Sequence, residues 1–459
     1  MRNWNFRDAI IWNIFRLLGN RSEENIRRVY KLLGKIYPSV PDDPIVARAF
    51  RSAFGAESTL PAVFKRIVQE CNPTVVRKVV ETLIIRWNVT DGRRIRQEYK
   101  EQHGHPPPTF FVISPTMACN LRCTGCYAAG YTKEDDLPVE YVDKAISEGK
   151  ELGVFFITIS GGEPFIREDL LDIYAKHSDV FFLVYTNGCV LKPALAEKLG
   201  KLGNVAPGIS VEGFERETDE RRGRGMHRRI LEAMENLRRA GVLFGMSITP
   251  TRFNSDVISS EEFLDYYIER GVKFAWFFQY IPIGRDPDPD LMSTPEQRNR
   301  LREAVWEARK TKPVFIGDFW NDGPLARGCM AGGRAYFHIN VHGDYEPCVF
   351  QQFAVDNVRE KSIRELIESE YFQAIREAMK DFRHNWFMPC MIIDHPCVLR
   401  ELVKTYGAYP TYPDSKSLVD DPAITQFLDQ YSERMEEVTE PKWQECFGDL
   451  SPVAEKVHG

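Results

Sequence analysis

The strongest constraint on the fold is an alternation, between residues 110 and 319, of short apolar segments with longer amphipathic ones. The apolar segments are rich in Val, Ile and Phe, as expected for strands that are buried on both faces of a parallel sheet. The segments between them have the spacing of helices that cover such a sheet, so we predict an α/β fold of six strand-helix units. The candidate strands are 110–113, 154–160, 180–185, 206–211, 243–249 and 273–280, and the candidate helices are 138–152, 168–177, 193–202, 226–240 and 259–270.

The regions on either side of this alternation have different patterns. Residues 1–106 show helical spacing interrupted by Asn and Pro, with little strand pattern. Beyond residue 320, two apolar segments flank a His-Gly-Asp turn and predict a hairpin over 335–349, followed by a helix over 361–379. The expected domains are a helical N-terminal region (1–106), the barrel (107–320), a small α+β extension (321–400) and a helical tail (401–459).

Three cysteines, Cys119, Cys123 and Cys126, form a CxxxCxxC motif in the loop after the first predicted strand. Three thiolates at this spacing can hold three irons of a 4Fe-4S cluster and leave the fourth iron without a protein ligand. A structural zinc ion is the alternative, because Cys-rich loops commonly bind zinc. Zinc requires four ligands, and His103 or His105 would have to supply the fourth from the far side of the strand. The motif alone leaves both metals open.

The motif and its position resemble the cluster-binding loop of the radical S-adenosylmethionine (SAM) enzymes. That family usually has an aromatic residue before the third cysteine, where this sequence has Gly125, and an aromatic residue, Tyr127, follows instead. The resemblance implies that SAM binds the open iron and is cleaved by one electron into methionine and a 5'-deoxyadenosyl radical, which abstracts hydrogen from an unactivated carbon. It also implies a partial (β/α)6 TIM-like barrel, with the reactive groups on loops at the carboxyl ends of the strands.

Four further segments at the ends of later predicted strands match the family in order. The resemblance implies that the GGEP segment at 161–164 contacts the methionine amino group of SAM, and that 186–188 lies near its ribose or methionine part. Ser210 and Glu212 would reach the ribose hydroxyls and the carboxylate. Arg222 could pair with the SAM carboxylate through its planar guanidinium, with a solvated basic turn as the alternative. The residues that the resemblance assigns to SAM binding are Tyr127, Gly161, Gly162, Glu163, Pro164, Thr186, Asn187, Ser210, Glu212, Arg222 and Ile283, the last in a segment similar to the adenine-contacting edge.

A second group of cysteines, Cys329, Cys348, Cys390 and Cys397, lies beyond the predicted barrel. Its opening half resembles the SPASM extension of the radical SAM family, which carries auxiliary clusters. Four cysteines saturate one 4Fe-4S cluster, so the resemblance is to the shorter Twitch version with a single auxiliary cluster in an electron-transfer or structural role. A zinc ion with four cysteine ligands is the alternative.

Composition limits the compartment and the partners. With 43% apolar and 27% charged residues, the 459-residue chain is typical of a soluble globular protein, and its net charge of -6 gives no overall attraction to nucleic acid. Seven of the ten cysteines fall into the two metal-like groups, which favours metals over disulfides. No segment reaches the ~18 consecutive apolar residues that span a bilayer. In the absence of a cleavable signal peptide, we expect a cytoplasmic protein.

The first predicted helix, 2–18, has one apolar face, with Trp4 and Trp12 nearby. The face is formed by Ile11, Ile14, Phe15 and Leu18. It could lie in a membrane interface, which would bring the protein to the inner face of the membrane. The alternative is that it packs on the core of the protein itself, the more frequent role of an amphipathic helix.

The cofactors implied by the resemblance are SAM, a SAM-binding 4Fe-4S cluster and an auxiliary 4Fe-4S cluster, with a reduced electron donor such as ferredoxin or flavodoxin as a partner. The leading hypothesis for the substrate is a membrane lipid or isoprenoid chain that undergoes carbon-carbon bond formation. The alternative is crosslinking or oxidation of a ribosomally made peptide or protein, although residues 1–106 lack the strand pattern of a peptide-binding winged-helix element. A third hypothesis is a non-enzymatic iron-sulfur electron carrier, against which the SAM-binding segments argue.

Overall fold

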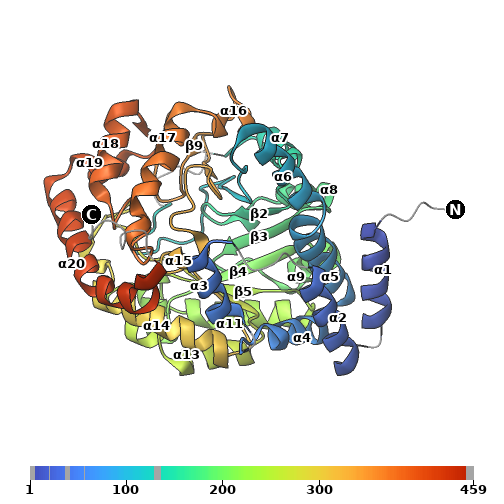
Figure 1. Cartoon of the computed structure of the whole chain (residues 1–459). Helices are drawn as coiled ribbons and strands as arrows, with labels where there is room; N and C mark the ends of the chain where they lie inside the picture. The colour runs from blue at the N-terminus through green and yellow to red at the C-terminus, as the bar shows by residue number, and fades with distance from the viewer. Residues whose placement is uncertain (1–5, 20, 37–41, 56, 129–135, 451–459) are drawn as a thin grey trace.

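Parallel strands form the centre of the molecule. A computed structural model describes residues 6–19, 21–36, 42–55, 57–128 and 136–450. Neighbouring strands pair in parallel in the sheet order β7-β6-β5-β4-β3-β2-β1 (Figure 1), which confirms the α/β class and all six predicted strands. These strands are β1 (Phe111–Ile113), β2 (Phe156–Ile159), β3 (Phe181–Thr186), β4 (Val205–Val211), β5 (Gly245–Ile248), β6 (Phe274–Phe277) and β7 (Phe315–Asp318). The sequence did not predict β7, because half of its four residues are Gly and Asp, which are rare in strands.

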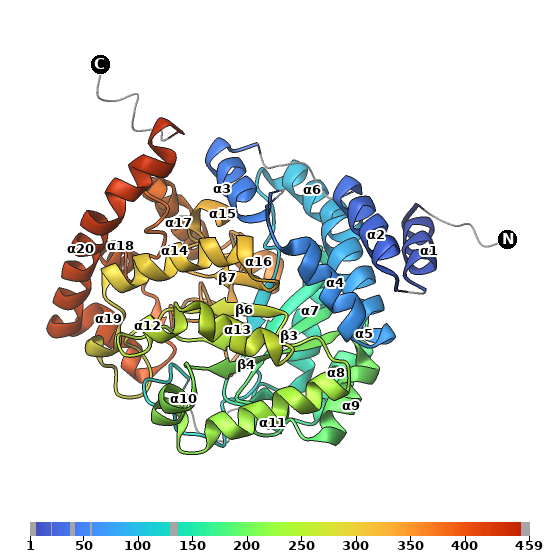
Figure 2. The ribbon, with the colours of Figure 1, turned by 90° about the horizontal axis from the view of Figure 1, so that it is seen from below.

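Helices cover the outer face of this sheet, as seen from below in Figure 2. All five predicted helices are present. A further helix, α14, was not predicted. Their ends follow local chemistry: the Ser260 hydroxyl accepts from the Phe263 amide at the start of α13, and α9 ends at Gly203, whose φ of +75° suits glycine. The helices are α7 (Val139–Glu151), α8 (Asp169–Lys176), α9 (Pro193–Leu202), α11 (Met226–Arg239), α13 (Glu261–Glu269) and α14 (Pro295–Thr311).

The N-terminal helices close the amino-terminal end of the strands. Phe181, the first residue of β3, and Ala206, the second of β4, share one buried apolar core with Ile14, Val29 and Val68. These last three residues come from the N-terminal region and are 0% exposed. The helices of this region are α1 (Phe6–Leu18), α2 (Glu23–Ile36), α3 (Pro44–Phe54), α4 (Leu60–Glu70), α5 (Pro73–Lys78), the π-helix η1 (Val79–Arg86) and α6 (Asp91–His103).

This packing decides between the two roles considered for the first helix. Ile14 is fully buried and Leu18 is 6% exposed, while Ile11 and Phe15 pack partly against the same core. The apolar face of α1 therefore packs on the core of the protein itself, as the alternative expected, and this contact gives no support to a membrane interface. Trp4 lies outside the described residues. Among the described helices, none is long and apolar enough to cross a bilayer.

The predicted hairpin extends the central sheet. Strand β8 (His338–Ile339) pairs in parallel with β1, and β9 (Tyr345–Glu346) pairs antiparallel with β8. The sequence indicated the hairpin but not its attachment to β1, because pairing between distant segments leaves no local pattern. The helix predicted over 361–379 is two helices, α16 (Ile363–Ile367) and α17 (Glu370–Ala378), with Ser369 at the N-cap position of the second.

The C-terminal helix α20 (Pro422–Phe447) packs against α14 and lies on the side of the molecule opposite α1 (Figure 1, Figure 2). Its Trp443 and Phe447 share a buried core with Ile45 of α3, and Arg48 pairs with Asp449 at 2.6 Å. The C-terminal helix is thus joined to α3 of the N-terminal region. The remaining elements are α10 (Glu215–Arg222), α12 (Ser255–Ile258), α15 (Gly323–Ala326), α18 (Pro396–Tyr406), α19 (Ser417–Asp420), β10 (Phe353–Ala354), β11 (Tyr409–Pro410) and 3-10 turns at Pro164–Ile166, Pro289–Leu291, Met379–His384, Pro413–Lys416 and Gly448–Leu450.

Candidate active site and auxiliary cluster site

The cysteine loop, residues 114–128, leaves the carboxyl end of β1 and lies along the GGEP segment, residues 161–164, which follows β2. The amide of Gly162 donates to the carbonyl of Thr116 at 2.9 Å. A Cβ atom at position 162 would lie 2.3 Å from the carbonyl oxygen of Ala118, so glycine is what allows the two backbones to approach. The sequence motif GGEP is thus explained by direct packing on the cysteine loop.

Glu163 ties the GGEP segment to the turn after β3. Its fully buried carboxylate accepts from the Thr186 hydroxyl at 2.8 Å and from the Asn187 amide at 2.7 Å. Burial raises the pKa of Glu163 to about 7 against the lowering effect of these donors. The side-chain amide of Asn187 continues the network, because it donates to Asn120 at 2.8 Å and lies 3.8 Å from the Cys119 sulfur.

Glu212, at the end of β4, is buried, and one of its carboxylate oxygens accepts hydrogen bonds from two arginines. Arg221 donates to its Oε1 at 2.7 Å, and Arg222 donates to the same atom at 2.7 Å. The alternative of a solvated basic turn for Arg222 is wrong, because its side chain is only 11% exposed and lies close enough to interact with charges on Cys123 and Cys126. Glu212 Oε2 is buried without a partner among the described residues. An unpaired buried acceptor is costly, so this atom suits a donor that a ligand brings.

A last segment closes on the cysteine loop from β6. Ile283 is fully buried, and a Cβ atom at Gly284 would lie 2.3 Å from the carbonyl oxygen of Cys126. On the other side of the loop, the Tyr127 hydroxyl is hydrogen-bonded to Ser160 at 2.6 Å. The carboxyl ends of parallel strands meet at one end of a sheet, so the structure brings the predicted SAM-binding segments together there. They carry Tyr127, Gly161, Gly162, Glu163, Pro164, Thr186, Asn187, Ser210, Glu212, Arg222 and Ile283.

Five of the seven predicted ligand cysteines share a local arrangement that the sequence did not reveal. In each, the backbone amide two residues further along the chain points at the cysteine sulfur. Hydrogen bonds of this kind favour a thiolate over a thiol, and thiolates are what a metal cluster binds. The five pairs are Leu121 with Cys119, Ala128 with Cys126, Ala331 with Cys329, Phe350 with Cys348 and Ile392 with Cys390.

Three cysteines of the second group lie close together under the hairpin. Burial raises the pKa of the Cys390 thiol well above its ordinary value, and nearby charges on Asp394, Cys329 and Cys348 raise it further. The Cys390 amide donates to the Asp394 carboxylate at 2.9 Å, which fixes the loop that follows Cys390. Cys329 and Cys348 thus lie near enough to Cys390 to raise the pKa of its thiol, and that the three hold one cluster stays a prediction.

Cys397, the fourth predicted ligand of this group, differs from the other three. Its side chain is exposed on the first turn of α18. Among the described residues, no three His, Cys, Asp or Glu side chains are grouped closely enough to hold a metal ion. The role of Cys397 stays a prediction.

Comparisons with known proteins agree with this geometry. The model of the radical SAM superfamily matches residues 113–264, and a model of the SPASM iron-sulfur cluster-binding domain matches 329–392. The mycofactocin maturase MftC of Mycolicibacterium smegmatis is 30% identical over 296 residues, which cover 60% of this chain and 74% of MftC. The chain belongs to the radical SAM superfamily. It is also similar to the AdoMet-dependent heme synthase of Methanosarcina barkeri, with 26% identity over 301 residues, 59% of this chain and 85% of that protein.

Solved structures show the same fold. SuiB of Streptococcus suis bound to S-adenosylmethionine has a TM-score of 0.53 and 18% identity, and the match covers 62% of this chain and 72% of SuiB. SuiB bound to its precursor peptide SuiA gives a TM-score of 0.52. The TIM-like radical SAM barrel with a C-terminal extension is therefore confirmed.

This radical SAM enzyme uses SAM, a SAM-binding 4Fe-4S cluster and an auxiliary cluster. When bound, these cofactors supply a 5'-deoxyadenosyl radical by reductive cleavage of SAM. The residues present fit the cofactors: amides point at the cysteine sulfurs, Arg222 places positive charge beside the cysteine loop, and Glu212 has a free buried oxygen. That each predicted cysteine and SAM-binding residue plays its assigned role remains our proposal.

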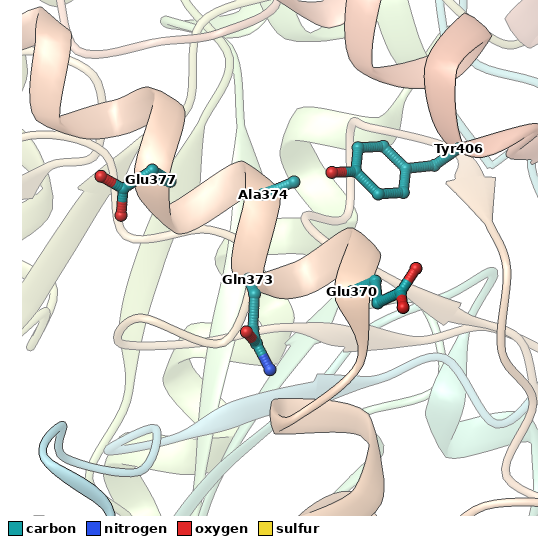
Figure 3. Close-up of a pocket in the computed structure, with 5 residues that line it drawn as sticks. All are labelled: Glu370, Gln373, Ala374, Glu377 and Tyr406. Atoms are coloured by element: carbon teal, nitrogen blue, oxygen red, sulfur yellow. The ribbon is translucent and has the colours of Figure 1, made fainter.

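His338, which lies next to the start of the cysteine loop, has both ring nitrogens hydrogen-bonded within the chain. His338 of β8 is hydrogen-bonded through Nε2 to the Ser114 hydroxyl at 2.7 Å and through Nδ1 to Glu346 at 2.5 Å. His338 is therefore a structural residue of the hairpin and not a free metal ligand. A surface pocket of about 320 Å³ lies between α17 and α18 (Figure 3), away from every predicted site residue, and is lined by Glu370, Gln373, Ala374, Glu377 and Tyr406.

Proposed function

We propose that this radical SAM enzyme modifies a side chain of a ribosomally made peptide or protein, by crosslinking or oxidation, with reduced ferredoxin or flavodoxin as its electron donor. The observation that carries the proposal is the similarity to MftC, a maturase, of which this chain covers 74%. The complex of SuiB with its precursor peptide shows that a protein of this fold binds a peptide.

The inner face of the barrel suits an uncharged side chain. Tyr185 of β3 and Trp276 of β6 are partly exposed, whereas the residues next to them in sequence are buried in the core shared with the helices. Phe278 packs against Tyr185, with ring centroids 5.4 Å apart, and against Phe319 at 5.4 Å. We call these four residues the aromatic wall. Partly exposed rings at the carboxyl ends of barrel strands provide apolar contact area near the expected site of radical formation.

A lipid substrate is not supported. That hypothesis rested on the first helix as a membrane element, and the apolar face of α1 is buried in the protein's own core. The relatives described above are a mycofactocin maturase, a heme synthase and SuiB bound to its precursor peptide, and none is named for a lipid.

The N-terminal region sets a condition on the peptide proposal. Every element that the structure describes within residues 6–106 is helical, and α1, α2, α4, α5 and η1 close the end of the barrel opposite the cysteine loop. A peptide that reaches the cysteine loop would therefore be recognised by other parts of the chain or by a separate binding protein.

The proposal can be tested before the substrate is identified. Cells would be grown in heavy water and fractionated into peptides, tetrapyrroles and lipids, and each fraction incubated anaerobically with reconstituted enzyme, SAM and a reductant. We expect deuterium to appear in 5'-deoxyadenosine with the peptide fraction only. Transfer from the lipid or tetrapyrrole fraction instead would refute the proposal. Cys123→Ala serves as the control, because loss of one predicted ligand of the SAM-binding cluster should abolish 5'-deoxyadenosine formation.

A further inference from the structure

Tyr336 lies next to the auxiliary cysteines and precedes β8. Its hydroxyl donates a hydrogen bond to the Cys348 sulfur at 2.7 Å. The side chain is 1% exposed and Cys348 is 8% exposed, so both partners of this bond are inside the protein. No sequence motif marked this tyrosine, because the contact depends on the fold of the hairpin.

The ring of Tyr336 is fixed by its neighbours. It stacks on Phe110 with centroids 5.1 Å apart and an interplanar angle of 5°, and Phe319 meets it at a near right angle of 88° with centroids 5.5 Å apart. Its backbone amide donates to the carbonyl of Met330 at 3.0 Å. Because two aromatic contacts and a backbone hydrogen bond fix the ring, its hydroxyl stays directed at the sulfur. No further conformational entropy has to be lost to form that hydrogen bond.

We propose that the Tyr336 hydroxyl raises the reduction potential of the auxiliary cluster by its hydrogen bond to Cys348. Reduction adds one negative charge to an iron-sulfur cluster and its thiolates. A donor that points at a ligand sulfur stabilises the more negative, reduced form more than the oxidised form, so the potential rises. The effect is large where water cannot compete for the sulfur, as in this buried site.

The inference goes beyond the proposed function and does not depend on the identity of the substrate, since a potential is measured without turnover. It does rest on Cys348 as a cluster ligand. Tyr336 is a positioning residue in this account, because it acts through the cysteine and not on the substrate.

The test compares two tyrosines of the same hairpin. Tyr336→Phe removes the hydroxyl and keeps the ring in its packing. Tyr345→Phe is the matched control, because Tyr345 is also buried but its hydroxyl donates to the carbonyl of Lys361 at 3.1 Å and not to a sulfur. Both would be made in a full-length chain in which Cys119, Cys123 and Cys126 are replaced by Ala, so that the auxiliary cluster is the only one that titrates.

The midpoint potential would be measured by redox titration followed by electron paramagnetic resonance. We expect a more negative potential in Tyr336→Phe and an unchanged one in Tyr345→Phe, with equal iron content. The same potential in Tyr336→Phe as in its parent, or an equal shift in both variants, would overturn the proposal. Failure to bind iron when Cys348 is replaced by Ala would support the ligand role on which the inference rests, and full retention of iron there would also overturn it.

A second measurement keeps the test decisive if Tyr336→Phe does not hold its cluster. In the parent chain, the reduced cluster should show magnetic coupling to a hydroxyl proton, which is lost in heavy water before the slowly exchanging amide protons of Phe350 and Ile392. Tyr345→Phe should show the same rapidly exchanging coupling. Absence of any such exchangeable coupling would refute the hydrogen bond.

Discussion

A buried ion pair connects the barrel to the auxiliary site, and its removal gives the sharpest test of how that site is held. Arg298 of α14 forms two hydrogen bonds with Asp394, at 2.6 and 3.0 Å, and both side chains are 0% exposed. Arg298 also donates to Asn321 at 3.1 Å and to the carbonyl of Phe387 at 3.2 Å. Asp394 in turn accepts from the amide of Cys390, so α14 positions the loop of a predicted cluster ligand.

Arg298→Met keeps much of the volume but leaves the Asp394 carboxylate buried without its cation. Breaking a buried pair in this way typically costs about 3–5 kcal/mol. If this cost lowers the free energy of local opening of the loop that follows Cys390, the population of the open state rises about a hundred- to several thousand-fold. We expect the variant to lose auxiliary iron while it keeps the SAM-binding cluster, because Cys119, Cys123 and Cys126 lie on a different loop.

The assay is the rate at which a chelator removes iron from the anaerobically purified protein, together with iron content per chain. Arg400→Met is the control, because Arg400 and Asp429 form a partly exposed pair with side chains 25% and 46% exposed. Such a pair contributes at most about 1 kcal/mol. Equal iron release from the wild type and Arg298→Met would refute the reasoning, as would equal loss from both variants.

Three further predictions follow from the site. Cys397→Ala should lower the auxiliary iron content if this exposed cysteine is the fourth ligand, and unchanged iron would remove it from the ligand set. Phe278→Ala should raise the KM for the substrate about tenfold, for roughly 1.5 kcal/mol of lost apolar contact, whereas Phe253→Ala, at a residue 68% exposed, should not. The pKa of Glu163 is raised from an ordinary 4.5 to about 7, so its contribution to the stability of the apo protein is fully present below pH 4.5 and lost as the pH rises through 7. Unfolding of wild type and Glu163→Gln between pH 4 and 8 should show that dependence in the wild type alone, with an upper limit of roughly 3 kcal/mol.

The parts of the fold that could be predicted from sequence are those with local patterns. The six strands of the barrel are apolar runs between helical segments, and the cysteine loop and GGEP carry their spacing in the sequence. Strand β7 was not predicted, because Gly317 and Asp318 interrupt its apolar pattern. Gly317 is nevertheless required, since a Cβ atom there would lie 2.3 Å from the ring of Trp276 on the neighbouring strand.

The first helix shows a different limit of sequence reasoning. Periodicity identified Ile14 and Leu18 as one apolar face, and that face exists. What covers an apolar face depends on segments far away in the chain, here Phe181 and Ala206 at the start of two barrel strands. The membrane interpretation lacks support at this step, because an apolar pattern in the sequence does not tell which surface covers the face.

The pairing of β8 with β1 explains how two metal sites can be held in a fixed relation. Ser114 lies five residues before Cys119, and Glu346 lies two residues before Cys348. His338 of β8 connects them, because its Nε2 is hydrogen-bonded to the Ser114 hydroxyl at 2.7 Å and its Nδ1 to the Glu346 carboxylate at 2.5 Å. Strands β1, β8 and β9 are consecutive in one sheet. Adjacent strands are held about 4.8 Å apart by their backbone hydrogen bonds, so the two cysteine-bearing loops start from neighbouring, rigid positions. A flexible linker between barrel and extension could not set this distance, and the hairpin therefore serves as the structural connection between the two sites.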